Sequence, residues 1–90
     1  MDLKAAVARY LAAAGGFGRP MPLSHFHLPK HETEAMLEAW DEDYHLNRHF
    51  ELISAPSQAA DADRHIVKGT TYHQIVFKES VRQVLDHALD

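Results

Sequence analysis

Histidine is frequent in this chain, with eight imidazole side chains among ninety residues. Imidazole and carboxylate groups bind zinc, and Asp41, His45 and His49 have the four-residue spacing that would place three ligands on one face of a continuous helix. The stretch "LNRHFELI" after His45 has the composition of a strand, however. We therefore expect the helix to end near Tyr44 or His45, which separates His49 from the other two, and we expect no metal ion and no cofactor.

Enzyme motifs give no catalytic assignment. The chain has no cysteine, no G-x-S-x-G segment and no glycine-rich loop after a strand. His31-Glu32 is followed by Thr-Glu-Ala, so the second histidine of the zinc-protease motif H-E-x-x-H does not occur at its position. We expect no catalytic residues, and the sequence predicts a protein that binds rather than one that catalyses.

Acidic side chains are concentrated in one segment. Residues 29–45 contain six Asp or Glu against one lysine, whereas the rest of the chain contains eight Lys or Arg against seven Asp or Glu. Such a run is usually the solvated face of a helix, and its first glutamates suit the positive end of the helix dipole. The second interpretation is a protein-binding face for a basic partner. The residues of that face would be Glu34, Glu38, Asp41 and Glu42.

Hydrophobic periodicity predicts helices in the first half of the chain. Residues 2–14 have an apolar stripe at helical spacing, and Gly15-Gly16 is expected to end that helix. A short second helix is predicted in "MPLSHFH", and a longer third helix begins at Pro29. The stripe expected to be buried in the third helix is Thr33, Met36, Leu37, Trp40 and Tyr44.

The second half of the chain changes period. "RHFELIS" and "TTYHQIVF" are rich in aromatic and β-branched residues and predict strands, with a hairpin turning at Lys68-Gly69. A fourth helix, "ESVRQVLDHALD", closes the chain. Its apolar face either packs on the core or forms a seam for self-association. That face comprises Val81, Val84, Leu85 and Leu89.

The middle of the chain resembles a winged helix-turn-helix domain. The residues that carry the resemblance are Phe26, Leu28, Pro29, Thr33, Leu37 and Trp40, followed by Leu46 and Arg48 at the entry to the wing strand. A helix before them and a hairpin after them fit the same order of elements, and His27 stands where the family usually has a turn glycine. The resemblance implies an α+β fold over residues 2–77, with three N-terminal helices and a small antiparallel hairpin or sheet.

The same resemblance implies DNA binding through the longer helix, which in this family enters the major groove. DNA affinity depends on Lys and Arg that neutralise phosphates, and six acids on the reading helix oppose it. We therefore predict a protein-binding module, with a DNA-binding regulator as the alternative. The cationic residues available to that alternative are Lys30, His31, Arg48, Arg64 and Lys68.

Size and composition favour one domain spanning residues 1–90. The chain is 46% hydrophobic and 24% charged, which is ordinary for a soluble globular protein. The Ala-rich start has a helical period interrupted by Arg9, so we interpret it as folded structure rather than as a signal peptide. These features predict a cytoplasmic protein without a membrane-spanning segment.

Overall fold

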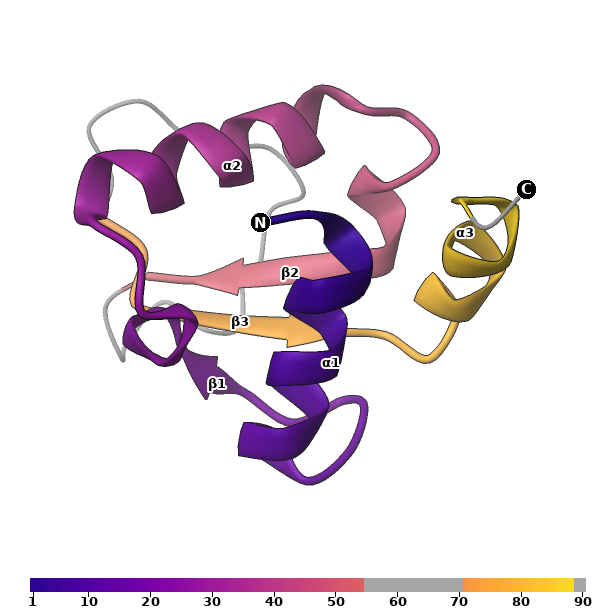
Figure 1. Ribbon diagram of the computed structural model, residues 1–90, viewed down its shortest axis with the longest axis horizontal. Coiled ribbons are helices and arrows are strands. Elements are labelled where there is room, and N and C mark those ends of the chain that lie inside the picture. The colour runs from indigo at the N-terminus through magenta and orange to yellow at the C-terminus, as the bar shows by residue number, and fades with distance from the viewer. Residues whose placement is uncertain (55–70, 89–90) are drawn as a thin grey trace.

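The computed structural model describes residues 1–54 and 71–88 of the chain. In this part of the chain three antiparallel strands form a sheet, two α-helices lie over one of its faces, and a third α-helix follows the last strand (Figure 1). The fold is therefore α+β, as the sequence predicts. The elements are α1 (Leu3–Ala14), β1 (Met21–Pro22), η1 (Leu23–Phe26), α2 (Lys30–Glu42), η2 (Asn47–His49), β2 (Phe50–Ile53), β3 (Gln74–Phe77) and α3 (Val81–Ala88).

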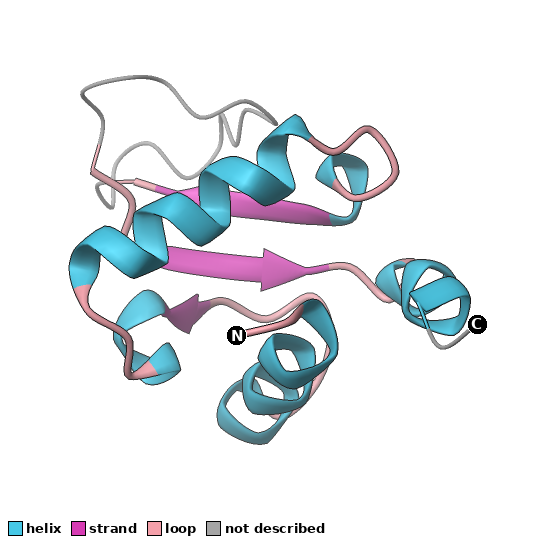
Figure 2. Ribbon diagram, turned by 45° about the horizontal axis from the view of Figure 1, so that its top comes forward, coloured by secondary structure: helices cyan, strands magenta, loops and turns pink. Residues whose placement is uncertain are grey.

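The sheet has β3 at its centre, paired antiparallel with β1 on one side and β2 on the other. Phe50 is paired with Phe77, and Leu52 is paired with Ile75. Because side chains alternate along a strand, these four point to the same face of the sheet, where all four are buried. The helices α1 and α2 lie over that face, while α3 lies beyond the end of β3 (Figure 2). One core between sheet and helices therefore supports the domain.

The helix α1 ends where the sequence predicts, and it begins one residue later than predicted, at Leu3. The Asp2 side chain caps its first turn by accepting a hydrogen bond from the backbone N–H of Ala5 at 2.8 Å. Gly15 ends the helix in the left-handed conformation, with a φ of 84°, and donates its N–H to the carbonyl of Leu11. A side chain on Gly15 would be strained at this φ, so glycine suits the position.

The prediction of three N-terminal α-helices is wrong for the second one. The segment expected to form it is η1, a 3-10 helix of four residues. Pro22 precedes η1, and the backbone of His27 leaves the helical region with a φ of 57°, so too few residues remain for a stable α-helix. Phe26 at its end is nevertheless fully buried in the core, as the apolar pattern requires.

The helix α2 begins directly after Pro29, close to its predicted start, but its buried stripe is shorter than predicted. Tyr44 is 79% exposed rather than buried. The reason is that α2 ends at Glu42 and Asp43 takes an extended conformation, which rotates the following residue out of the helical register. The rest of the stripe agrees with the prediction, since Thr33, Leu37 and Trp40 are buried and Met36 is half-buried.

The strands lie where the sequence predicts them but are shorter. The first two residues of "RHFELIS" belong to η2, and β2 begins at Phe50. In "TTYHQIVF" the strand β3 begins at Gln74, after Thr71, Tyr72 and His73. The predicted turn at Lys68-Gly69 and the strand leading into it lie outside the described residues.

His27 offers a direct test of the turn between η1 and α2. A non-glycine residue in the left-handed region costs about 1–2 kcal/mol, although histidine tolerates it better than most. We expect His27→Gly to raise the free energy of unfolding by roughly 0.5–1 kcal/mol, measured by urea denaturation. His25→Gly is the matched control, because His25 lies within η1 without a positive φ. That control is expected to lose stability, and a gain in both variants would contradict the argument.

Candidate functional site

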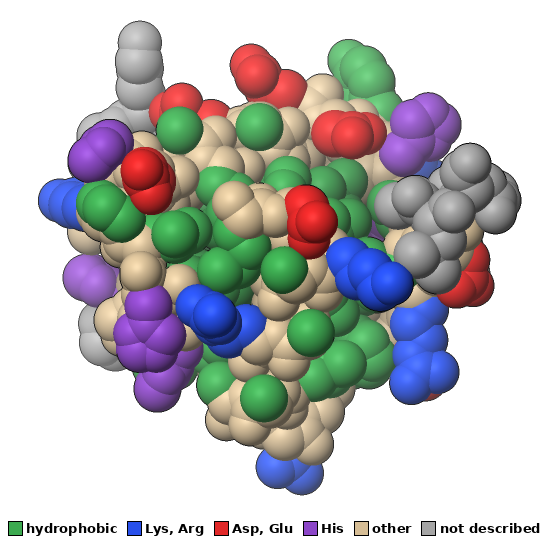
Figure 3. Space-filling view, viewed as in Figure 1, with side chains coloured by type: hydrophobic (Ala, Val, Ile, Leu, Met, Phe, Trp, Pro, Cys, Tyr) green, Lys and Arg blue, Asp and Glu red, His purple; other side chains and the backbone are tan. Residues whose placement is uncertain are grey.

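The outer face of α2 carries a row of carboxylates. Glu34, Glu38 and Glu42 follow one another at four-residue intervals, and all three are exposed. At a rise of about 1.5 Å per residue, neighbours in the row are separated by roughly 6 Å along the helix axis. Figure 3 shows acidic side chains over the part of the surface formed by α2. We call these three residues the α2 acidic row.

The α2 acidic row is electrostatically unfavourable for the helix that carries it. Among the described residues none of the three forms an ion pair, and the last turn of α2 contains no basic residue. Like charges at four-residue spacing destabilise a helix by a few tenths of a kcal/mol per pair, and acids near the C-terminal end oppose the helix dipole. The stability of the isolated domain therefore gives no reason for carboxylates at Glu38 and Glu42.

Asp41 differs from the other predicted residues of this face. Its side chain is half-buried, and its backbone carbonyl accepts a hydrogen bond from the Asn47 side-chain amide at 3.1 Å. This bond ties the last turn of α2 to η2. The structure thus groups Glu34, Glu38 and Glu42 on one exposed row and places Asp41 at the side of that row, where it joins the next element.

Tyr44 lies on the surface of this region, although the apolar pattern of the sequence predicts that it is buried. Asp43 shapes the turn that presents it, because its Oδ1 accepts the N–H of His45 at 2.8 Å and its carbonyl accepts the N–H groups of Leu46 and Asn47. The phenol ring therefore lies on the surface, directly after two exposed carboxylates, Glu42 and Asp43. The sequence feature that could have indicated this turn is Asp43, because an aspartate side chain often accepts the backbone N–H of the residue two positions later, here His45.

The cations that the DNA-binding alternative needs are not gathered in the described part of the chain. Lys30 and His31 lie in the first turn of α2, whereas Arg48 lies in η2 beyond the other end of that helix. A helix of 13 residues is about 20 Å long, so these groups are far apart. All three are exposed. The other two predicted contacts, Arg64 and Lys68, lie outside the described residues.

Asp41, His45 and His49 do not form a metal site. Because α2 ends at Glu42, His45 is exposed in the following turn and His49 is buried in η2. His25 and His27 form a separate pair, with ring centroids 6.5 Å apart and rings nearly perpendicular. Among the described residues, no group of three or more His, Asp or Glu side chains has an arrangement that could hold a metal ion.

His49 instead joins two elements of the fold. Its residue is 8% exposed, and its Nδ1 lies 2.7 Å from the hydroxyl oxygen of Ser80, just before α3. Its carbonyl also accepts the N–H of Lys78 at 2.9 Å. Burial lowers the pKa of the His49 imidazole below its ordinary value, and the nearby positive charges of Arg48 and Lys78 lower it further.

The depressed pKa of His49 makes stability pH-dependent. In the unfolded chain His49 binds a proton below about pH 6.5, while the folded protein resists protonation there, so stability falls as the pH falls through this region. We expect the urea midpoint to decrease between pH 7.5 and 5.5, and to decrease less in His49→Gln. Equal slopes in the two proteins would show that His49 is not the responsible group.

The apolar face of α3 faces partly into the molecule. Val81 is fully buried in the core, and Leu85 packs against that core. Val84 is half-buried, while Leu89 lies outside the described residues. Packing within one chain therefore explains why Val81 and Leu85 are apolar. Among the described residues of the predicted seam, Val84 is the one that this packing does not explain.

The sequence matches no protein-family model, and comparison with curated proteins and with solved structures gives no match either. No helix among the described residues is both long and apolar enough to cross a membrane.

Proposed function

We propose that this domain is a non-catalytic protein-binding module and that the α2 acidic row receives a basic segment of its partner. The observation that carries the proposal is the placement of Glu38 and Glu42, which are exposed and form no ion pair to any described residue. They are like charges at four-residue spacing, and Glu42 lies in the last turn of α2, where a carboxylate opposes the helix dipole. A positively charged partner would offset these unfavourable interactions. Complementary charge would also speed the encounter of the two proteins.

Tyr44 adds a second kind of contact to the same face. Tyrosine is enriched at interface positions that contribute most to binding, because its ring gives a large contact area at a low entropic cost. An exposed ring beside carboxylates also suits lysine or arginine, whose cation is attracted to the face of the ring. The proposed partner segment therefore carries several Lys or Arg, together with apolar residues.

The arrangement of elements supports a domain of winged-helix type, which we include in the proposal. A helix precedes the short element η1, a turn at His27 leads to the longer helix α2, and the strands β2 and β3 follow. His27 adopts the positive φ that the usual turn glycine of the family would adopt readily. In this domain the face of the longer helix that would enter DNA carries carboxylates, so we assign it to protein recognition.

The proposal is tested by fluorescence anisotropy with two labelled probes at low and moderate salt. The first probe is a peptide of about 20 residues, amphipathic and rich in lysine and arginine, and the second is a random DNA duplex. We expect micromolar binding of the peptide, weakened by salt, and no binding of the duplex. A peptide of the same length with glutamine in place of every cation is the control. Binding of the duplex in preference to the peptide would contradict the proposal and favour the DNA-binding regulator.

A further inference from the structure

An open surface pocket of about 680 Å³ lies where the start of α2 approaches the ends of the sheet strands, one helical turn before Glu34 of the α2 acidic row. Its walls come from η1, from the first residue of α2, from Ser54 after β2 and from the segment that enters β3. The pocket is open to solvent, so a small molecule bound in it would remain partly exposed. The residues that line it include Leu23, Lys30, Thr71, Tyr72 and His73.

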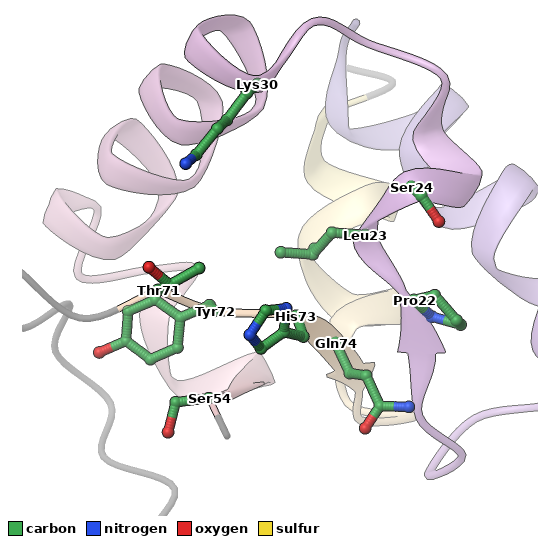
Figure 4. A pocket seen from close by; sticks show the side chains of 9 residues that line it. All are labelled: Pro22, Leu23, Ser24, Lys30, Ser54, Thr71, Tyr72, His73 and Gln74. Carbon is green, nitrogen blue, oxygen red and sulfur yellow. The ribbon is translucent and has the colours of Figure 1, made fainter. Parts of the chain in front are cut away.

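The described residues that line this pocket carry a positive charge, whereas the protein as a whole is negative. The chain carries thirteen Asp or Glu and a formal charge of −4, yet none of the described residues that line the pocket is a carboxylate. Lys30 contributes a full positive charge, and the hydroxyl of Thr71 and the imidazole of His73 contribute hydrogen-bond donors. In Figure 4 the Lys30 side chain extends toward Thr71 and Tyr72, and the His73 ring lies near Leu23.

The backbone of His73 is fixed, so its ring enters the pocket from a rigid support. Its N–H donates to the carbonyl of Ile53 at 2.9 Å, and its carbonyl accepts the N–H of Leu23 at 2.8 Å. These two bonds connect the segment before β3 to the end of β2 and to η1. The wall of the pocket at His73 is therefore held in place before a ligand binds.

From this geometry we propose that the pocket binds a small organic anion. The carboxylate or phosphate group of the ligand contacts the Lys30 ammonium and the hydroxyl of Thr71. Its planar or apolar body lies against Leu23 and the ring of Tyr72. Lysine binds such oxygens as a point charge, and because Lys30 is exposed, solvent screening limits its contribution to a few-fold gain in affinity. This proposal does not depend on the function proposed for the α2 acidic row.

In the test, the whole protein is titrated with phenyl phosphate and with benzoate, and binding is monitored by the chemical shifts of its backbone amides. We expect both probes to shift the signals of residues 23–24, 30 and 71–74, and benzyl alcohol to bind more weakly. Lys30→Gln is expected to weaken the binding of phenyl phosphate roughly three- to fivefold. Lys4→Gln, which removes an exposed lysine of α1 outside the pocket, is the matched control and should leave the affinity unchanged.

Three results would overturn the proposal. They are shifts spread over the whole surface, equal binding of benzyl alcohol and phenyl phosphate, and an affinity that Lys30→Gln leaves unchanged. Because Lys30 is exposed and lies in the first turn of α2, its replacement by glutamine is expected to leave the fold intact. The unfolding midpoint of the variant checks this point.

Discussion

Trp40→Ala is expected to remove a large part of the stability of this domain. The Trp40 side chain is 8% exposed and contacts rings from three other elements, so its loss leaves a cavity bounded by η1, α2 and the sheet. Replacing a buried tryptophan by alanine costs about 3–5 kcal/mol, against a total of about 5–15 kcal/mol for a typical domain. The rings that surround it are Phe26 at 6.4 Å, Phe50 at 6.1 Å and Phe77 at 5.9 Å between centroids.

Urea denaturation followed by circular dichroism measures this loss, and Tyr44→Ala is the control on the same segment. Tyr44 is 79% exposed, so its truncation is expected to change the free energy of unfolding by less than about 0.5 kcal/mol. The same substitution should nevertheless lower the affinity for the basic peptide if the Tyr44 ring belongs to the proposed interface. Comparable destabilisation by both variants would mean that Tyr44 is packed as the helical periodicity predicts, and that the end of α2 lies further along the chain.

The contrast between Trp40 and Tyr44 shows how much of the fold the sequence predicts. Apolar spacing identifies Trp40 as a core residue because regular helix precedes it from Lys30 onward. The same spacing gives the wrong result for Tyr44, four residues later. The extended conformation of Asp43 ends the helix, and the spacing of apolar residues does not show where the backbone leaves the helix. The C-terminal end of α1 was predictable because Gly15 marks it directly.

The two candidate sites also differ in whether the sequence predicts them. The α2 acidic row could be predicted, because residues on one exposed helical face follow from local periodicity. The pocket could not, because Lys30, Leu23 and His73 come from three segments that only the sheet pairing brings together. In the sequence, His73 is one of eight histidines and lies within a predicted strand. Its position between η1 and β2 depends on two long-range backbone hydrogen bonds.

Glu42→Lys is expected to change stability and binding in opposite directions. The substitution removes a like-charge pair with Glu38, gives Glu38 an attractive partner in the favourable orientation, and places a cation at the C-terminal end of α2. Together these effects should raise the free energy of unfolding by about 1 kcal/mol, or the melting temperature by roughly 4–8 °C. The same substitution should lower the affinity for the basic peptide roughly five- to tenfold at low salt.

Asp86→Lys separates a local effect from a change in net charge. Asp86 is an exposed carboxylate on α3, so its replacement changes the charge of the protein by the same amount as Glu42→Lys but leaves α2 intact. If α2 is the binding face, Asp86→Lys retains most of the affinity for the peptide. Equal losses in the two variants would mean that the peptide responds to the overall charge of the protein. A Glu42→Lys protein that is more stable and binds less would show that α2 carries its carboxylates for the partner and at the expense of its own helix.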